Sequence, residues 1–423
     1  MINQHKYILL YFLIGFSILF LRSSDAFLVP TFYAEDGVWL GNAISDGWVN
    51  AFINTRADYF VIGNLLILFI SSNLSNMITG SEFLLTPIFI AIFSNIFFIT
   101  VFYSCAAVIK SYLSISEKYK FTLFLLFVLI PLGDHSNEVL GRALQIGFFM
   151  PVLALNALLL SKKSELSKKS TISILILSLL TSPLSIIPIF VFYIKDIAYN
   201  RKLSIICNDK FKIIAYVSIF SITVGRIIYS AQNLIRAQSV EHVDNIIELF
   251  FARSILYPVI YPFYTHLNNY IVILLTIMLV LFFYGAVKKS SYLISVLIIN
   301  ILLMFTALYL TRPDITNYIS GYSRTFPDRY FMTINLLAMM SIYTLILSSK
   351  PNLKKITLTS VIVLTLLSFN KLFDLNKPKQ NFSKGQSFIN SACHSLTLPY
   401  TQIPPGMWKM RVSPEEKKKL KCQ

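Results

Sequence analysis

The sequence predicts an all-α protein that crosses a membrane many times. Of its 423 residues, 55% are apolar and 13% are charged, whereas average chains are about 45–50% apolar and about 25% charged. Long apolar stretches recur along the chain, and the lysines between them are unevenly placed. Too few polar side chains remain to cover a water-facing surface, so lipid must supply part of the solvent. A soluble enzyme, a secreted scaffold and a disordered regulator are therefore excluded.

The apolar stretches predict about 9–11 transmembrane helices. Stretches able to cross about 30 Å of hydrocarbon lie near 7–22, 84–109, 213–232, 269–287, 291–310, 330–349 and 355–370. Shorter stretches lie at 121–133, 146–161, 171–182 and 186–199. Between the last two, Pro183 and Pro188 interrupt a continuous helix, so this pair forms either two spans or a re-entrant, broken hairpin.

The basic residues predict the orientation of these helices. With the N-terminus inside, the inner segments hold 18 of the 37 basic residues, and 17 of the 18 are lysine. All nine basic residues in the outer segments and helices before residue 371 are arginine. An excess of positive charge on cytoplasmic loops is the usual orientation signal, so the N-terminus is predicted to be cytoplasmic. The net charge of +17 does not indicate nucleic-acid binding, because no single domain collects it.

The chain divides into a membrane domain, 1–370, and a tail, 371–423. An odd number of crossings places the tail on the outer, periplasmic side, where Cys393 and Cys422 could form a disulfide. The first outer segment, 23–83, is long. We expect its apolar stretch 61–70 to lie in the membrane interface, because a crossing there would move the lysine-bearing segment 110–120 outside.

Two adjacent acids, Glu35 and Asp36, follow the first predicted membrane helix. Such a pair either caps a helix in a solvated loop or supplies acid–base chemistry at the membrane surface. The residues alone leave both interpretations open. In the second outer segment, His135 has no second His, Cys or acid at ligand spacing, so it does not indicate a metal site.

Arginines gather at the same predicted membrane surface, among them Arg142, Arg226, Arg324 and Arg329. A guanidinium group binds phosphate in a planar fork, where lysine is only a point charge. A phosphate head group therefore suits these arginines, and ion pairing with the outer acids is the alternative. The sequence has no phosphate-binding Gly-rich loop, dinucleotide turn, nucleophile elbow or metal-spaced Cys or His cluster. Acid and arginine at a lipid interface fit glycosyl transfer from a lipid phosphate.

From Ala34-Glu35-Asp36-Gly37 onward, the order of features resembles the membrane-embedded GT-C glycosyltransferases. Within them it is most similar to the serotype-converting O-antigen glucosyltransferases of enteric bacteria and their phages. The supporting features are the interfacial helix, Glu138 ahead of Arg142, the proline-broken hairpin at 181–188, Asp328-Arg329-Tyr330 opening a late helix, and Ile403-Pro404-Pro405-Gly406-Met407-Trp408 in the tail. The resemblance implies a GT-C-like bundle in the bacterial inner membrane, with a long first periplasmic loop and a small periplasmic tail.

The resemblance also implies an inverting hexosyltransferase. It would take a hexose, expected to be glucose, from undecaprenyl phosphate glucose and transfer it to a hydroxyl group of lipid-linked O-antigen. Asp36 would accept the proton of that hydroxyl, with Glu35 orienting the acceptor or the base. No cofactor is required. A divalent metal, if one is used, would be held by Glu35 and Asp36.

The same resemblance assigns residues to the two substrates. Arg329 and Arg324, and in second place Arg226 and Arg142, would bind the donor phosphate. Acceptor binding or support of the site would fall to Asp58, Glu138, Asp328, Tyr330, Trp39 and Trp408.

Three other functions share some of these features. An O-antigen polymerase also uses periplasmic arginines on lipid-linked glycans, without a sugar monophosphate donor, and is the nearest alternative. A lipid-linked glycan flippase, which is not an enzyme, predicts charges in the middle of the membrane helices, where this sequence has almost none. An acyltransferase would need a catalytic histidine within the membrane, and His135, His242 and His266 all fall in predicted loops.

Overall fold

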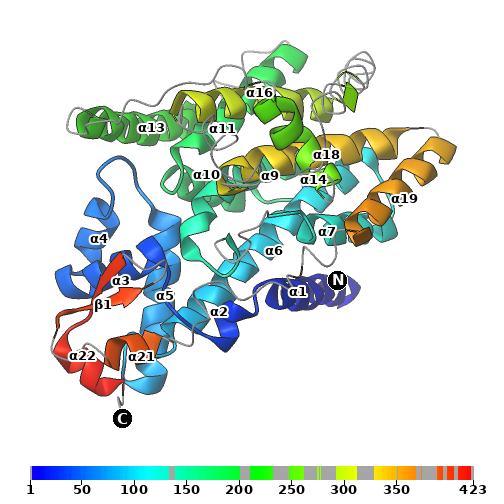
Figure 1. Cartoon of the computed structure of the whole chain (residues 1–423). Helices are drawn as coiled ribbons and strands as arrows, with labels where there is room; N and C mark the ends of the chain where they lie inside the picture. Colours follow the sequence, from blue (N-terminus) through cyan, green and yellow to red (C-terminus); the bar gives the residue numbers. More distant parts are fainter. Residues whose placement is uncertain are drawn as a thin grey trace.

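The computed structural model describes residues 2–132, 139–200, 210–231, 246, 248–261, 274–275, 277, 292–311, 328–349, 351–367, 373, 388–393, 398–403 and 408–420. The chain is almost entirely helical in these ranges, as predicted (Figure 1). The tail corrects the all-α prediction, because β1 (Tyr400–Ile403) and β2 (Trp408–Arg411) form a two-stranded antiparallel sheet. Thr401 and Ile403 are buried while Gln402 is exposed, an alternation over too few residues to predict a strand.

The N-terminal third begins with α1 (Ile2–Arg22). The predicted first outer segment then contains α2 (Asp25–Leu28), α3 (Ala34–Asp46), α4 (Trp48–Asn54) and α5 (Ile62–Thr79). The long helix α6 (Thr86–Leu113) and the shorter α7 (Glu117–Val128) follow. After these come η1 (Ala143–Gln145), α9 (Ile146–Lys162), α10 (Lys168–Leu179), η2 (Pro183–Ser185) and α11 (Ile186–Asn200).

The second half continues with α13 (Lys210–Ala231), the π-helical segment η4 (Glu248–Leu256) and α14 (Tyr257–Ile260). It then contains α16 (Tyr292–Thr311), η6 (Asp328–Phe331), α18 (Met332–Ser348) and α19 (Pro351–Leu367). In the tail, α21 (Phe388–Cys393) precedes the sheet and α22 (Pro414–Lys419) follows it. The predicted apolar stretch 269–287 lies almost wholly outside the described residues.

Five described helical segments are long and apolar enough to cross a membrane. They are α5, α6, the η1–α9 segment, α16 and the η6–α18 segment. Three shorter apolar helices lie at 7–22, 216–229 and 249–260. A polytopic, mainly helical membrane protein is consistent with this set of helices.

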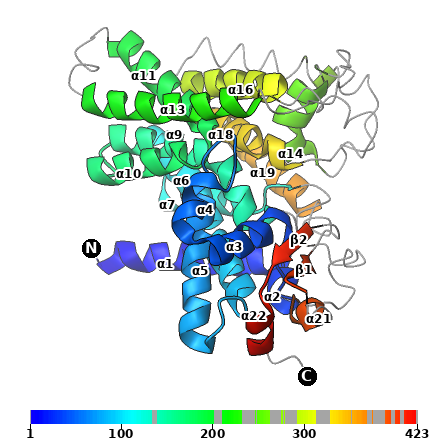
Figure 2. The same cartoon turned by 90° about the vertical axis from the view of Figure 1, so that its left-hand side faces the viewer.

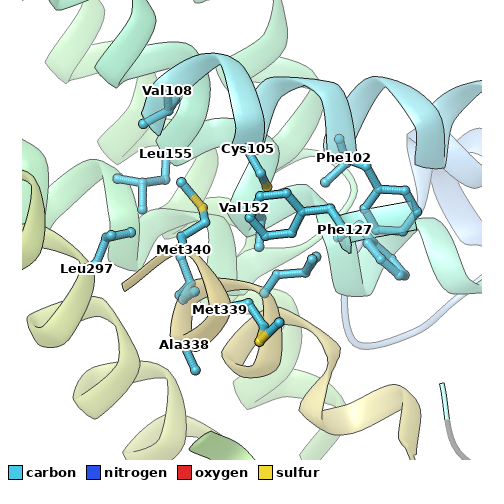
Figure 3. Close-up of a cluster of buried hydrophobic side chains, with 14 of the residues drawn as sticks. Phe102, Cys105, Val108, Phe127, Val152, Leu155, Leu297, Ala338, Met339 and Met340 are labelled. Carbon is cyan, nitrogen blue, oxygen red and sulfur yellow. The ribbon is translucent and has the colours of Figure 1, made fainter. Parts of the chain in front are cut away.

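The main core surrounds α18, which is buried from Met332 to Leu347. This helix contacts α6, α9, α16, η4 and α19. Figure 3 shows Phe102 and Cys105 of α6, Val152 of α9 and Met339 and Met340 of α18 gathered in this core. A helix that is apolar on every side needs either lipid or protein around it, and α18 is surrounded by protein.

The predicted break within the apolar stretch 171–199 is present. Helix α10 ends at Leu179 and α11 begins at Ile186, with the short η2 turn between them. Pro183 opens η2, a position where its missing N–H group costs no hydrogen bond. Both helices pack against α9, and the break brings residues 181–184 to the cavity described below.

Helix α5 runs across the direction of α1, α13 and α16 (Figure 2). It begins at Ile62 and ends at Thr79, so it is longer than the interfacial stretch 61–70 that the sequence predicts. By length and composition it could itself cross a membrane. If α1, α13 and α16 cross the bilayer, this arrangement directs α5 along the membrane surface.

The tail packs against α3, as Figures 1 and 2 both show. Phe388 of α21 makes an edge-on contact with Phe32, their ring centroids 4.7 Å apart. Arg411 of β2 forms an ion pair with Asp46 at the end of α3. This packing places the tail and α3 on the same side of any membrane that the protein crosses.

We expect Gly41→Ala to separate the tail from α3. A Cβ atom at residue 41 would lie 2.6 Å from the backbone oxygen and 2.8 Å from the backbone nitrogen of Arg411, and a backbone strand cannot move aside as a flexible side chain can. The tail of the variant should be cleaved faster in limited proteolysis of the purified protein.

Gly225→Ala is the matched control, because residue 225 also lies in a helix and a Cβ atom there meets nothing within 4 Å. Both substitutions raise helix propensity by about 1 kcal/mol, so only the steric contact differs between them. Equal cleavage rates for the two variants would contradict the packing.

Candidate functional site

The two predicted acids lie in the first turn of α3, and they point in different directions. Tyr33 is extended and Ala34 has a φ of +44°, so the chain turns sharply into the helix. Successive helical residues are about 100° apart around the axis, and this separates the neighbouring carboxylates. Glu35 is half-buried and lines a cavity. Asp36 is 1% exposed and is not part of the cavity wall.

Asp36 joins α3 to the start of α9. Its Oδ2 atom accepts a hydrogen bond of 3.0 Å from the backbone N–H of Ala143 in η1. Burial raises the pKa of the Asp36 carboxyl to about 7, while Arg142 and the backbone N–H groups of Ala143 and Leu144 lower it and Glu35 raises it slightly. Asp36, to which the resemblance assigns the role of base, therefore contacts η1 and does not line the cavity.

Three further side chains fix the segment 141–145. Asn64 of α5 donates through Nδ2 to the backbone oxygens of Ala143, at 2.6 Å, and Leu144, at 3.1 Å. Asn95 of α6 accepts from the backbone N–H of Gly141, whose φ of +69° favours glycine. The third is Arg142, which donates to the backbone oxygen of Thr31 at 3.1 Å.

These contacts set one wall of a cavity of about 370 Å³. Its charged lining comes from Glu35, Arg56, Asp58 and Arg329. Apolar side chains from α13 and α16 line another part, among them Ile227, Leu308 and Leu310. Between these lie four aromatic side chains, Trp39, Tyr59, Phe148 and Tyr330, and a polar group formed by Asn64, Gln145, Thr181, Ser182 and Thr311.

Arg56 and Asp58 form a two-pronged ion pair in the cavity wall. Nε of Arg56 donates to Oδ1 of Asp58 at 2.9 Å, and Nη2 donates to Oδ2 at 3.0 Å. Arg226 of α13 stabilises the same loop through donation to the backbone oxygens of Ile53, at 2.7 Å, and Arg56, at 2.5 Å. The orientation of Arg56 is thus fixed from two sides.

Arg329 lies shortly before the first residue of α18 and lines the cavity. It lies in η6, beside Tyr330, with its guanidinium carbon 5.3 Å from the Tyr330 ring centroid. The Tyr330 ring in turn meets Phe148 of α9 edge-on, with centroids 5.5 Å apart. Residues 35, 56 and 329, distant in sequence, therefore contribute to one cavity.

The predicted site residues separate into three groups. Those that line the cavity are Glu35, Trp39, Asp58, Arg329 and Tyr330. Those that lie outside its wall are Asp36, Arg142, Arg226 and Trp408, the last on β2 in the tail. Those beyond the described residues are Arg324, Glu138 and Cys422, together with the side chain of Asp328.

Sequence reasoning missed Arg56, Tyr59, Asn64 and Gln145, which also line the cavity. Arg56 gave a usable signal, because it is another outer arginine two residues before an acid. The two amides gave none, since single Asn and Gln residues in apolar segments form no motif.

Two predictions concern a disulfide bond and a metal site. Cys393 is disulfide-bonded, and Cys422, the partner that we predict, is not among the described residues. The described ranges contain no group of three or more His, Cys, Asp or Glu side chains placed to hold a metal. Glu35 and Asp36, the pair named for a divalent ion, have different surroundings, because Asp36 is bonded to Ala143.

Comparisons with known proteins do not place the chain in a family. No family model, curated protein or solved structure matches it. Any function must therefore be argued from the residues of the cavity and from its position in the fold.

We expect the stability of the wild-type protein, relative to Asp36→Asn, to fall as the pH rises. Below a pH of about 4, the pKa of aspartate in an unfolded chain, the Asp36 carboxyl is protonated in both the folded and the unfolded state. Between this pH and about 7, the unfolded chain loses the proton while folded Asp36 keeps it, so the folded state loses stability as the pH rises. The difference should amount to a few kcal/mol, on the order of the pKa change. Thermal unfolding in detergent across this pH range measures it.

Glu165→Gln, which removes one acid at an exposed residue away from the cavity, controls for the change in net charge. A constant difference between wild type and Asp36→Asn throughout this pH range would show that the Asp36 carboxyl is not buried as described.

Proposed function

We propose that the chain is an inverting glycosyltransferase of the bacterial inner membrane. It would move a hexose, expected to be glucose, from undecaprenyl phosphate to lipid-linked O-antigen on the periplasmic side. The observation that carries the proposal is a single cavity with a carboxylate, two arginines, aromatic rings and an apolar wall from two long helices. Each part corresponds to one chemical part of the two substrates.

The donor phosphate would bind between Arg329 and Arg56. Guanidinium groups suit phosphate because they donate two parallel hydrogen bonds and keep their charge. Asp58 holds Arg56 in one orientation, which lowers the entropy lost when phosphate binds. The two arginines would also stabilise the negative charge that develops on the departing phosphate.

Glu35 would act as the base. The oxygen of the acceptor hydroxyl attacks the anomeric carbon of the donor sugar while its proton passes to the Glu35 carboxylate. The bond between the anomeric carbon and the phosphate oxygen breaks, and its electron pair stays on undecaprenyl phosphate. One displacement from the opposite face inverts the anomeric configuration. We prefer Glu35 to Asp36 because Glu35 lines the cavity and Asp36 is bonded to Ala143.

The apolar wall would receive the prenyl chain. Leu310 is 70% exposed although it also lines the cavity, so the cavity reaches the outer surface of the helical bundle there. Two apolar side chains on α13, Ile222 and Ile228, are exposed as well. An apolar exterior next to a charged cavity lets a lipid enter from the bilayer with its phosphate leading.

The proposed orientation rests on charge and packing together. The lysine-rich segments predict a cytoplasmic N-terminus. The tail packs on α3 beside the cavity, so the tail and the cavity would both lie on the periplasmic side. Helix α5 would lie along that membrane surface.

We expect Glu35→Gln to abolish transfer. Glutamine keeps the shape of the side chain but cannot take a proton, and loss of a general base costs about 10²–10⁴-fold in rate. The readout is mass spectrometry of the O-antigen repeat unit from cells that make undecaprenyl phosphate glucose. Wild type should add one hexose per repeat, and the variant should add none at equal protein abundance.

Glu165→Gln, at an exposed residue away from the cavity, should act like wild type. Asp36→Asn keeps an oxygen that can accept from Ala143 and should retain more activity than Glu35→Gln. The reverse order would return the base role to Asp36. An unchanged repeat mass with altered polymer length in cells with the wild-type chain would replace the proposal with an O-antigen polymerase.

Arg329→Lys should reduce transfer by about tenfold or more, because lysine keeps the charge but loses the two-pronged contact with phosphate. Initial rates with purified protein and a labelled donor lipid measure the loss. Arg411→Lys makes the same change at an exposed ion pair in the tail and should leave the rate unchanged. Equal rates for the two variants would remove Arg329 from the phosphate site.

A further inference from the structure

Gln145, the last residue of η1, has a buried amide group without a hydrogen-bond partner among the described residues. The residue is 0% exposed and contributes to the cavity wall. Neither Nε2 nor Oε1 makes a hydrogen bond within the part of the chain that the structure describes. Transfer of an amide without partners from water to an apolar environment costs up to several kcal/mol. Substitutions in proteins give a cost of about 1–3 kcal/mol for such a group. Such a group indicates that something outside the described chain supplies the missing bonds.

A second amide in the same wall has an unpaired oxygen. Asn64 is 1% exposed, and its Nδ2 atom donates to the backbone oxygens of Ala143 and Leu144. These bonds fix which end of the amide faces the backbone. Its Oδ1 atom has no hydrogen-bond partner among the described residues. Asn64 thus binds the two residues directly before Gln145, and both amide side chains line the same cavity.

The backbone around these amides cannot easily move to satisfy them. Asp36 accepts from Ala143, Asn95 accepts from Gly141, and the backbone N–H of Gly63 donates to Thr181 at 2.8 Å. The segment is therefore held on several sides, while both polar atoms of the Gln145 amide and Oδ1 of Asn64 have no hydrogen-bond partner among the described residues. This combination is typical of a binding surface that is formed before its ligand arrives.

The missing partners must both donate and accept hydrogen bonds. An amide offers N–H donors and a carbonyl acceptor, so an anion would satisfy only the donors and an alkyl chain would satisfy neither. A hydroxyl group both donates and accepts. Several hydroxyls on one ring match the amides of Gln145 and Asn64, and the aromatic side chains Trp39 and Phe148 line the same cavity.

We infer that Gln145 and Asn64 form the sugar-binding subsite of the cavity, which hydrogen-bonds the ring hydroxyls of the hexose carried by the donor lipid. The inference rests on the proposed function, since it assigns the sugar to one wall of the same site. The subsite lies on the α5–η1 wall, whereas Arg56 and Arg329 belong to the phosphate site. Gln145 would thus determine preference among sugars without acting on the phosphate.

The test compares two short-chain phosphodiesters of equal charge, one with the sugar and one with a methyl group in its place. Purified full-length protein in detergent is titrated with farnesyl phosphate glucose and with farnesyl methyl phosphate, for wild type and for Gln145→Met. Wild type should bind the glucosylated lipid more tightly. The variant should lose about tenfold in affinity for that lipid, as expected for lost neutral hydrogen bonds, and should bind farnesyl methyl phosphate as wild type does.

Two comparisons separate binding from folding. Gln145→Met replaces an unpartnered amide by an apolar side chain of similar length, so its unfolding temperature should equal or exceed that of wild type. Gln402→Met makes the same change at an exposed residue of β1 and should alter neither affinity. A lower unfolding temperature for Gln145→Met, with weaker binding of both lipids, would show a structural role and overturn the inference.

The remaining outcomes distinguish the two proposals. If wild type and Gln145→Met prefer the glucosylated lipid equally, the amide is satisfied by water and the sugar subsite is wrong, while the proposed function stands. If wild type binds both lipids equally, the cavity does not recognise the sugar and the inference fails. If wild type binds neither lipid, the proposed function itself fails and the subsite fails with it.

Discussion

The buried contact between Asp36 and the start of α9 is the constraint on which the site depends. It connects the first turn of α3 to η1, and the bonds from Asn64 and Asn95 complete the attachment. A carboxylate in an apolar environment is costly unless it accepts hydrogen bonds or meets a positive charge. The backbone N–H groups of Ala143 and Leu144 and the nearby Arg142 offset part of this cost, although burial still raises the pKa of Asp36 to about 7. The position of η1 then determines which side chains form the cavity wall.

This constraint explains why two adjacent acids differ in their chemistry. The rotation between consecutive helical residues directs one carboxylate toward η1 and the other toward the cavity. Asp36 fixes the direction of α3, and that direction presents Glu35 to the cavity. If Glu35 is the base of an enzyme, substitution of either acid would reduce activity. Substitution of Glu35 would remove the base, and substitution of Asp36 would displace it. Rates alone do not separate these effects, whereas unfolding as a function of pH does.

The sequence predicted the helical elements because their signals are local. Apolar length placed α6, α16 and α18, and Pro183 placed the break before α11, whereas Pro188 lies within α11. The acid pair was found because it directly follows a long apolar stretch. Which acid faces the cavity depends on the rotation of α3, and this rotation is fixed by contacts distant in sequence, with η1 and with the tail at Gly41. Gln145 and Asn64 were missed because a buried amide lacking a partner can be recognised only when its neighbours are known.

The tail and the cavity are mechanically connected through α3. One face of this helix approaches the backbone of β2 at Gly41, and its first turn carries Glu35 to the cavity. Arg226 connects the loop before α5 to α13 in the same way, from the side of the bundle. The carboxylate therefore stands on an element held by the tail, and Arg56 stands on an element held by a long apolar helix. In the proposed glycosyltransferase, the base and the phosphate-binding Arg56 would thus be held by different parts of the fold, the tail and the helical bundle.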